Sequence, residues 1–344
     1  MKVLYISQNM NNYRAAMYQQ DVMEEFSKQT NVVFYGPGFK GFEPYEHIKN
    51  VINKIGGVDF IIVGHSWLLD KSGVNIDPYP SLHLEDSPIK KYVILNKEYT
   101  NLDAKLKWIK EKSFDRAFTH HHDINIFEKR TSVPFSFIPF AFNKKLFEKF
   151  NGENKDIDFA FSGLLKNIYH KNNTQSDARI LIMKKLFYCF GDIPIFLKKK
   201  YSNYKIFWNS LPRFPWQQKI SILIKNYRYL KNEEYVSMTK RSRVYLNSLS
   251  PGGLVGTRFF ENMASKALVF CEESENLRRI FPSNSYISFK KDLSDFEERF
   301  EFALSDSSER TKIVNDAYEL AMINHSWEDR VKKIIDLIQI HNLN

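Results

Sequence analysis

The chain has 344 residues, and its 43% apolar content, with 29 Phe and 18 Tyr, is enough to fill two hydrophobic cores of ordinary domain size. This composition excludes a disordered chain, and no apolar run approaches the roughly 18 residues that a membrane-spanning helix needs. Fifty Lys and Arg against 40 Asp and Glu give a net charge of +10. Such an excess suits a nucleic acid, an anionic membrane surface, a polyanionic substrate or merely a solvated basic surface, and charge alone does not choose among them.

The amino terminus and the cysteines indicate the compartment. MKVLYISQNMNN has one Lys and few apolar residues, so it fits a first β-strand better than a secretory signal. Cys189 and Cys271 lie far apart and in no metal or redox spacing, so we expect buried free thiols instead of a disulfide. We therefore expect a cytoplasmic chain.

The first half alternates short apolar strands with amphipathic helices, which is typical of a parallel α/β sheet. We assign residues 1–150 to a first Rossmann-like domain. Its polar first loop, with Asn9, Asn11, Asn12 and Arg14, either contacts an acceptor or is an ordinary turn. Strands are predicted at residues 2–7, 32–35, 58–63, 91–95, 116–119 and 135–142. One helix ends near residue 28, others cover 45–55 and 143–150, and an amphipathic helix within 96–111 turns Leu102, Leu106 and Ile109 inward.

Glu98 is the main catalytic candidate of this half. It stands just beyond the strand at 91–95 and before an amphipathic helix, at the edge of the sheet where parallel α/β folds bind ligands. A carboxylate there projects toward a bound ligand instead of out to solvent. The alternative is that Glu98 pairs with Lys97 or caps the next helix.

Four consecutive polar residues, His120-His121-His122-Asp123, follow the strand at 116–119. Side chains on an extended segment point alternately to opposite sides, so we expect that they do not all converge on one metal ion. We predict instead that His121 donates a hydrogen bond to substrate. His65, just past the third strand, is either a further site residue or a structural histidine.

After a polar linker at 151–155 the pattern restarts with a strand at 158–161. The following loop contains Gly163, and a helix is predicted from residue 179 to about 190. The cationic residues in and just after this loop are Lys166, His170 and Arg179, although an Arg at a helix start is often simply solvated. Residues 197–228 are aromatic and basic, which suits either stacking on nucleic-acid bases or half-buried connecting strands.

The most informative stretch is 244–271. A strand at 244–249 ends at Pro251-Gly252-Gly253, a helix begins near Thr257, which can cap it, and another strand follows at 267–271. Arg258 and Glu261 are three residues apart and share one helical face. Free N–H groups, a positive helix end, a guanidinium and a carboxylate can together bind a phosphate and a ribose diol, whereas the alternative is a solvated ion pair.

The sequence of this stretch, YLNSLSPGGL followed by RFFENMASKALVF, resembles the donor-sugar segment of GT-B glycosyltransferases. It is most similar to the spore-maturation-type family and to phage DNA β-glucosyltransferases. The resemblance implies that Glu261 binds the nucleotide ribose and that Arg258 and Arg179 bind the diphosphate. It places the donor's phosphates at the loop with Gly163, Lys166 and His170. It further implies that Glu98 is the general base that takes a proton from the acceptor hydroxyl. It also implies two Rossmann-like domains facing each other across a cleft, with no metal and no cofactor beyond the nucleotide-sugar substrate.

Two departures from the family pattern matter. Many relatives have Gly where this chain has Lys266. The large retaining family has two glutamates eight residues apart at this place. Here the second is Glu261, but the position of the first holds Gly253, so we expect an inverting reaction. The second domain is placed at 156–326, with further elements at 286–289, 293–304 and 309–322, and a terminal helix at 327–344 is expected to cross back to the first domain.

These observations predict a glycosyltransferase that moves a sugar from a nucleotide-sugar to a saccharide or lipid-linked glycan in polysaccharide biosynthesis, with peripheral contact to an anionic inner membrane face. One alternative is a DNA-modifying glucosyltransferase. The other is a non-catalytic module that binds nucleotides or glycans.

Overall fold

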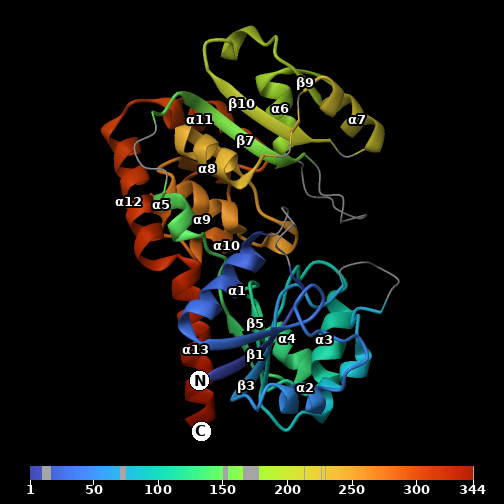
Figure 1. Ribbon diagram of the computed structural model, residues 1–344. Coiled ribbons are helices and arrows are strands. Elements are labelled where there is room, and N and C mark those ends of the chain that lie inside the picture. Colours follow the sequence, from blue (N-terminus) through green and yellow to red (C-terminus); the bar gives the residue numbers. More distant parts are fainter. Residues whose placement is uncertain are drawn as a thin grey trace. The chain divides into compact units, whose positions relative to one another are not determined.

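The computed structural model describes residues 1–9, 17–69, 75–149, 154–165, 178–212, 214–225, 227–228 and 230–343 (Figure 1). The chain divides into two compact units. One consists of Met1–Phe140 with Trp327–Asn344, and the other of Ala141–Ser326. Residues 141–149 therefore fall in the second unit, and the terminal helix α13 (Trp327–Leu343) falls in the first, where it packs on α1 (Met17–Gln29).

The first unit is built on a six-stranded parallel sheet in the order β2-β1-β3-β4-β5-β6. The strand order reverses between β1 and β3, and the carboxyl ends at such a point form a crevice that binds ligands in open α/β sheets. The strands are β1 (Lys2–Ile6), β2 (Asn31–Tyr35), β3 (Phe60–Val63), β4 (Lys91–Ile94), β5 (Arg116–Thr119) and β6 (Phe135–Phe137), and the remaining helices are α2 (Ile48–Lys54), α3 (Leu102–Glu111) and α4 (Ile124–Thr131).

All six predicted strands of this unit are present, but the last is shorter than expected. It ends at Phe137 instead of residue 142, because Pro139 has no N–H to continue the ladder.

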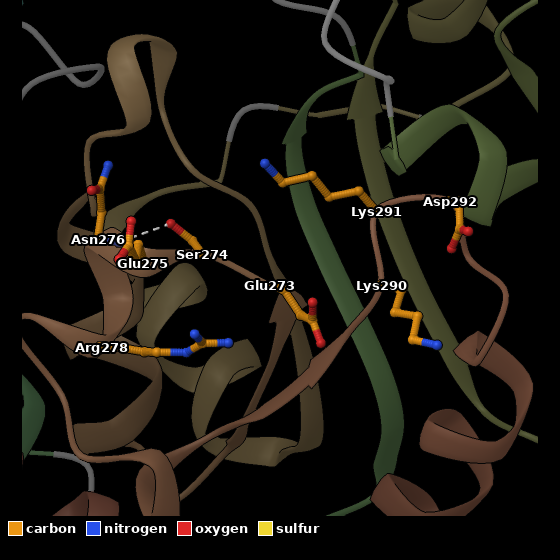
Figure 2. A pocket seen from close by; sticks show the side chains of 8 residues that line it. All are labelled: Glu273, Ser274, Glu275, Asn276, Arg278, Lys290, Lys291 and Asp292. Carbon is orange, nitrogen blue, oxygen red and sulfur yellow. Dashed lines mark hydrogen bonds between the residues drawn. The ribbon is translucent and has the colours of Figure 1, made fainter.

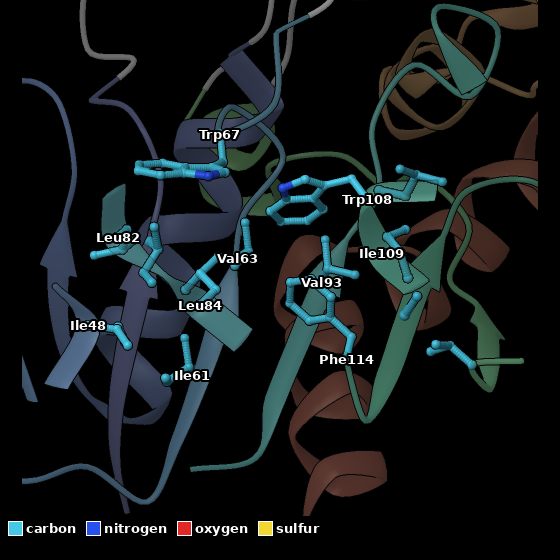
Figure 3. Close-up of a cluster of buried hydrophobic side chains, with 14 of the residues drawn as sticks. Ile48, Ile61, Val63, Trp67, Leu82, Leu84, Val93, Trp108, Ile109 and Phe114 are labelled. Carbon is cyan, nitrogen blue, oxygen red and sulfur yellow. The ribbon is translucent and has the colours of Figure 1, made fainter. Parts of the chain in front are cut away.

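One hydrophobic cluster of the first unit lies under one face of this sheet (Figure 3), and the opposite face is buried too, with Tyr5, Phe60 and Tyr92 fully covered. Trp67 and Trp108 are the largest members of the cluster and pack with aliphatic side chains from β3 and the short turns at Pro80–Leu82 and Leu84–Asp86. The indole N–H of the buried Trp108 donates to Asp77 Oδ2 at 2.8 Å, so this polar group is satisfied inside the core.

The second unit repeats the same strand order with one strand fewer. Its parallel sheet runs β10-β7-β11-β12-β13, so the first strand again lies between the second and the third. Buried phenylalanines fill its core, with the rings of Phe159 and Phe300 5.0 Å apart. The strands are β7 (Ile157–Leu164), β10 (Ile206–Leu211), β11 (Ser242–Asn247), β12 (Leu268–Glu272) and β13 (Ile287–Phe289), and the helices other than α7 are α5 (Lys144–Glu148), α6 (Ala178–Leu186), α8 (Asn232–Arg241), α9 (Thr257–Ala264), α10 (Glu275–Arg278), α11 (Phe296–Leu304) and α12 (Ser308–Asn324).

The segment after α6 differs from the prediction. The expected helix to residue 190 ends at Leu186, and an antiparallel hairpin follows, formed by β8 (Tyr188–Phe190) and β9 (Ile193–Ile195). Gly191 adopts a φ of +59° in the two-residue turn between them, a conformation that ends a helix and suits a tight hairpin. Residues 197–228 then contribute β10 to the central sheet and form α7 (Pro215–Leu223).

Both cysteines are free, with Cys271 buried and Cys189 half-buried. Lys266, where many relatives have Gly, has a φ of +51°. This left-handed conformation explains the preference for glycine at that position. Within the described ranges, no helix combines the length and the apolar character needed to cross a bilayer.

Candidate functional site

The order of the second sheet reverses between β7 and β11, and two of the predicted site residues meet there. Gly163 lies near the carboxyl end of β7, and Arg258 lies in the first turn of α9, which follows β11. A Cβ atom on Gly163 would be only 2.4 Å from Arg258 Nη1, and the φ of Gly163 is +150°. Gly163 therefore lets the guanidinium lie directly over the end of β7, where open α/β sheets bind ligands.

Glu261 follows one helical turn after Arg258. Its Oε2 accepts a 2.8 Å hydrogen bond from the hydroxyl of Tyr235 on α8. Burial raises the pKa of the Glu261 carboxyl, while the bond from Tyr235 and the charge of Arg258 lower it. The Tyr235 bond fixes the direction of the carboxylate, and among the described residues Oε1 has no hydrogen-bond partner of its own.

A buried amide pair anchors α9 to the sheet. Asn262 Nδ2 donates to Asn247 Oδ1 at 2.8 Å, and both side chains are buried. Ser265 Oγ donates to Thr239 Oγ1 on α8 at 3.1 Å. The sequence prediction missed these contacts, although a polar residue between Phe259 and Met263 on an apolar helix is a usable signal.

The glycine loop before α9 is closed by its own backbone. Ser250 N donates to Leu254 O at 2.8 Å across Pro251–Gly253, and Gly252 and Gly253 have φ values of +73° and +76°. The helix begins differently from the prediction, because Thr257 is its first residue and caps nothing. Gly256 occupies the N-cap position with extended backbone and no side chain to bond.

Arg179 lies in the first turn of α6 and joins the two strand ends. Its guanidinium donates to Leu164 O at the end of β7 and to Ser248 Oγ after β11, and it lies 5.8 Å from the centre of the Phe161 ring. Arg179 thus adds positive charge at the same sheet edge as Arg258. Lys166 and His170 lie outside the described residues.

An open depression of about 670 Å³ lies beyond the carboxyl ends of β12 and β13 (Figure 2). Asn276 connects it to the glycine loop, because its Nδ2 donates to Gly253 O at 2.8 Å. The groups around it can hydrogen-bond to hydroxyls or phosphate oxygens. The lining residues are Glu273, Ser274, Glu275, Asn276, Arg278, Lys290, Lys291 and Asp292.

In the first unit, Glu98 connects the loop after β4 to the end of β5. It is buried, and its Oε1 accepts bonds from Thr119 Oγ1 at 2.7 Å and from His120 N at 2.8 Å. Glu98 does not cap α3, whose N-cap position is Asn101. Its Oε2 is buried without a hydrogen-bond partner in the described part of the chain. A buried, unsatisfied carboxylate oxygen at a strand end can accept a proton or a substrate hydrogen bond.

A buried ammonium holds the loop that carries Glu98. Lys105 on α3 is 1% exposed, and its Nζ donates to Asn96 O at 2.7 Å and to Lys97 O at 3.3 Å. Lys97 and Asn101 both have a φ of +48°, a conformation that costs free energy for residues other than glycine. Lys105 therefore offsets the strain of this loop and positions Glu98.

His65 and His120 form a buried pair beside Glu98. His120 Nδ1 lies 2.7 Å from Ile138 O and therefore carries the proton, so its Nε2 accepts from His65 Nε2 at 2.9 Å. Burial, the largest cause, lowers the pKa of both rings, and both are neutral. His65 Nδ1 is left buried with no hydrogen-bond partner among the described residues.

His121, His122 and Asp123 differ from the expectation for an extended segment. The possible ligand atoms of these three residues all lie within 4.8 Å of one another, because the backbone bends at His120 and His122. Of the four residues 120–123, only His120 is turned away, toward the carbonyl of Ile138. Asp123 N donates to His121 Nδ1 at 3.1 Å, so Nδ1 is the acceptor of this ring and Nε2 is the nitrogen that can donate. His122 Nε2 lies 3.2 Å from Asp123 Oδ2.

Two parallel α/β sheets in one chain, each with a switch point in its strand order, are the architecture of the GT-B class of fold. A family model described as "Glycosyl transferase-like" matches residues 183–336, which is somewhat less than half of the chain. Comparison with the sequences of curated proteins finds no significant match.

Solved structures of similar fold cover nearly the whole chain. HepE from Anabaena, in complex with UDP-glucose, has a TM-score of 0.62 at 9% identity, over 99% of this chain and 100% of that one. A glycosyltransferase from Rickettsia africae has a TM-score of 0.63 at 11% identity, over 100% and 99%. Sucrose-phosphate synthase from Thermosynechococcus elongatus has a TM-score of 0.61 at 11% identity, over 100% of both chains. At these identities the likeness establishes the fold, and the predicted fold class is confirmed.

Proposed function

We propose that this chain is a glycosyltransferase that binds a nucleoside-diphosphate sugar at the switch point of its second sheet. The observation that carries the proposal is the position of the Arg258 guanidinium against Gly163, with the tethered Glu261 carboxylate one turn further on. The guanidinium and the first N–H groups of α9 suit the diphosphate, and the carboxylate suits the ribose diol. These roles are the ones implied by the sequence resemblance to the spore-maturation-type and phage DNA β-glucosyltransferases, and HepE, a neighbour of the same fold, forms a complex with UDP-glucose.

The reaction that we propose is an inverting transfer. Glu98 Oε2 takes the proton of the acceptor hydroxyl, the oxygen forms a bond to the anomeric carbon, and the bond from that carbon to the diphosphate breaks. Arg258 and Arg179 offset the charge that develops on the leaving diphosphate. His121 donates its ring N–H to substrate. The sugar of the donor lies by the glycine loop, towards the depression reached by Asn276.

The acceptor in this proposal is a saccharide or a lipid-linked glycan at the inner face of a membrane. No metal takes part, because Arg258, Arg179 and the helix amides supply the positive charge that a metal ion supplies elsewhere. Turnover in excess chelator should therefore equal turnover without it. A loss of activity that added divalent cation restores would contradict the metal-free reaction and direct attention to His121, His122 and Asp123.

Calorimetric titration with UDP and the other nucleoside diphosphates tests donor binding. Replacing Glu261 by Ala should weaken the best ligand by about tenfold or more, since a hydrogen bond to a charged group is worth about 1.5–3 kcal/mol. Glu301→Ala on the exposed side of α11 is the matched control and should leave affinity unchanged. Equal affinities in the three proteins would exclude Glu261 from the site.

Glu98→Gln distinguishes an enzyme from a non-catalytic binding module. The amide keeps the shape of the side chain and an acceptor oxygen for Thr119 and His120, but it cannot take a proton. An enzyme that uses this base loses turnover by about 100-fold or more and keeps its donor affinity. Undiminished turnover in the variant would refute the base assignment, and a wild-type chain without turnover would favour the module.

A further inference from the structure

The positive charge of the chain is concentrated in one segment. Residues 178–228 contain eleven Lys and Arg and a single acidic residue, Asp192, which gives the segment a net charge of +10. This equals the net charge of the whole protein, because the other residues contain 39 basic and 39 acidic side chains. Part of this charge is offset by acidic residues outside the segment, because Lys185 and Lys200 pair with Glu297, Lys205 with Asp156 and Arg228 with Glu234. The exposed lysines that remain are Lys184, Lys199, Lys219 and Lys225. Exposed charges of one sign on one part of a molecule attract anionic partners.

The same segment also exposes most of the surface apolar side chains. Of the eighteen large apolar side chains that are exposed among the described residues, thirteen lie between residues 178 and 228. Large apolar patches on a soluble domain are uncommon and mark an interaction surface. The thirteen are Leu181, Tyr188, Phe190, Ile195, Phe196, Leu197, Tyr204, Phe214, Trp216, Ile220, Ile222, Leu223 and Ile224.

Helix α7 carries its apolar face outward. Gln217 and Ser221, one turn apart, are buried against the unit, while Trp216, Ile220 and Leu223 follow the i, i+4, i+7 spacing on the exposed side. Leu223 is 80% exposed. A surface helix of a globular protein shows the opposite arrangement, with its apolar stripe toward the core. The exposed stripe therefore needs a partner outside this unit.

The β8–β9 hairpin lies next to α7. A Cβ atom on Gly191, at the hairpin turn, would be 2.9 Å from Gln217 Nε2, so the turn touches the buried side of the helix. Phe190 is 67% exposed and Leu197, just after the hairpin, is 69% exposed. Figure 1 shows β9, α6 and α7 at the same end of the second unit. The hairpin and α7 thus form one basic apolar surface, which we call the 178–228 surface.

We infer that the 178–228 surface docks the protein on an anionic lipid bilayer. Lysines beside outward Trp, Phe, Ile and Leu side chains are the composition of elements that lie in the membrane interface, where the apolar groups enter the acyl boundary and the lysines face the headgroups. This inference names the surface through which the proposed glycosyltransferase contacts the membrane, and it rests on the proposed function for the lipid-linked acceptor.

Charge argues against two other occupants. A second copy bound through the same surface would bring its exposed lysines, such as Lys199 and Lys219, against those of the first copy, which opposes a symmetric dimer. Nucleic acid would use the charge and the aromatic rings, but seven of the thirteen exposed side chains are aliphatic and offer no ring on which a base can stack. A bilayer uses the charge, the rings and the aliphatic groups together.

Flotation with vesicles tests this assignment. The full chain should bind vesicles of phosphatidylcholine and phosphatidylglycerol in equal parts, bind pure phosphatidylcholine at least about tenfold more weakly, and lose binding as salt is raised. The triple variant Trp216→Ser/Ile220→Ser/Leu223→Ser, and separately Lys199→Glu/Lys219→Glu, should each bind at least about tenfold more weakly.

The controls carry the same chemical changes elsewhere. Ile323→Ser/Ile340→Ser removes exposed aliphatic side chains, and Lys40→Glu/Lys49→Glu reverses exposed lysines of the first unit. Both should bind vesicles like the wild type. Nucleoside diphosphate affinity, measured on every variant, reports whether the second unit is intact and tests the donor site separately from docking.

Three results would overturn the inference. These are absence of vesicle binding by the wild type, equal losses in the surface variants and their controls, and binding that ignores lipid charge. Suppose that the wild type does not bind vesicles. If the surface variants then lose binding to single-stranded DNA, the surface binds nucleic acid, and if they lose self-association, it binds a second copy of the chain. Vesicle binding without nucleotide binding would leave docking in place and refute the proposed donor.

Discussion

Replacing Gly163 by Ala tests the geometry on which donor binding depends. The new Cβ would lie 2.4 Å from Arg258 Nη1 and 3.2 Å from both Cζ and Nη2, whereas ordinary contact begins at 3.4 Å. The guanidinium must therefore move by about 1 Å, which is enough to break a charge-assisted hydrogen bond to a phosphate. The Ala side chain also makes the φ of +150° unfavourable, at a cost of about 1–3 kcal/mol in stability.

The expected loss follows from the bond that is broken. A hydrogen bond to a charged group contributes about 1.5–3 kcal/mol, and each 1.4 kcal/mol changes affinity about tenfold, so nucleoside diphosphate affinity should fall by about 10- to 150-fold. Isothermal titration calorimetry measures it directly. Gly41→Ala is the matched control, because Gly41 has a φ of +83° and nothing within 4 Å of an added Cβ. It should lose stability and keep affinity.

A double-mutant cycle then shows whether the loss passes through Arg258. If the Cβ acts by displacing the guanidinium, Gly163→Ala should have little further effect on affinity in an Arg258→Ala background. Unchanged affinity in the single variant would refute the reasoning. So would a loss of the same size in both backgrounds, since Gly163 would then act by another route.

Three further predictions concern the supports of the two sites. Asn262→Ala leaves the side-chain amide of Asn247 buried without its hydrogen bond, so the free energy of unfolding in urea should fall by about 1–3 kcal/mol. Nucleotide binding should also weaken, because α9 loses an anchor to the sheet. A variant as stable as the wild type would contradict the role of the amide pair. Lys105→Met should cost about 1–3 kcal/mol in the same assay and reduce turnover, whereas Lys107→Met at a 77% exposed side chain should do neither. Because burial lowers the pKa of His65 and His120, the folded chain binds fewer protons at these rings than the unfolded chain does. Their contribution to stability is therefore complete above a pH of about 6.5, and it is lost as the pH falls toward the lowered pKa values. His65→Leu should flatten this dependence, and a wild-type stability that stays constant as the pH falls below about 6.5 would disprove it.

Periodicity was sufficient to predict the repeated α/β pattern. Short apolar runs bounded by Gly, Pro and polar residues marked nearly every strand of both sheets, because strands buried on both faces need continuous apolar runs. It failed between residues 186 and 228, where the hairpin, the edge strand β10 and the outward-facing helix α7 occur. Apolar residues there face outward, so the pattern that reports burial no longer applies.

The candidate site residues also fall into those that the sequence could place and those that it could not. Arg258 and Glu261 are one turn apart on a single helix, so the sequence alone placed them on one face. That Gly163 lies under Arg258, 95 residues away, depends on β7 and β11 being neighbours in the sheet. The hydrogen bond from Tyr235 to Glu261 likewise requires α8 and α9 to pack together, which no local spacing reports.

Residue order alone therefore determined what is local: the alternating elements, the glycine loop, the face shared by Arg258 and Glu261, and the position of Glu98 after a strand. Only the tertiary structure decided what is distant. It shows which strand ends are adjacent, that Glu98 binds the end of β5 while Lys105 holds the loop before it, and that exposed lysines of 178–228 lie beside an outward apolar surface. The physical reason is that helix and strand periodicity are set by neighbouring residues, whereas contacts between elements are set by packing of the whole domain.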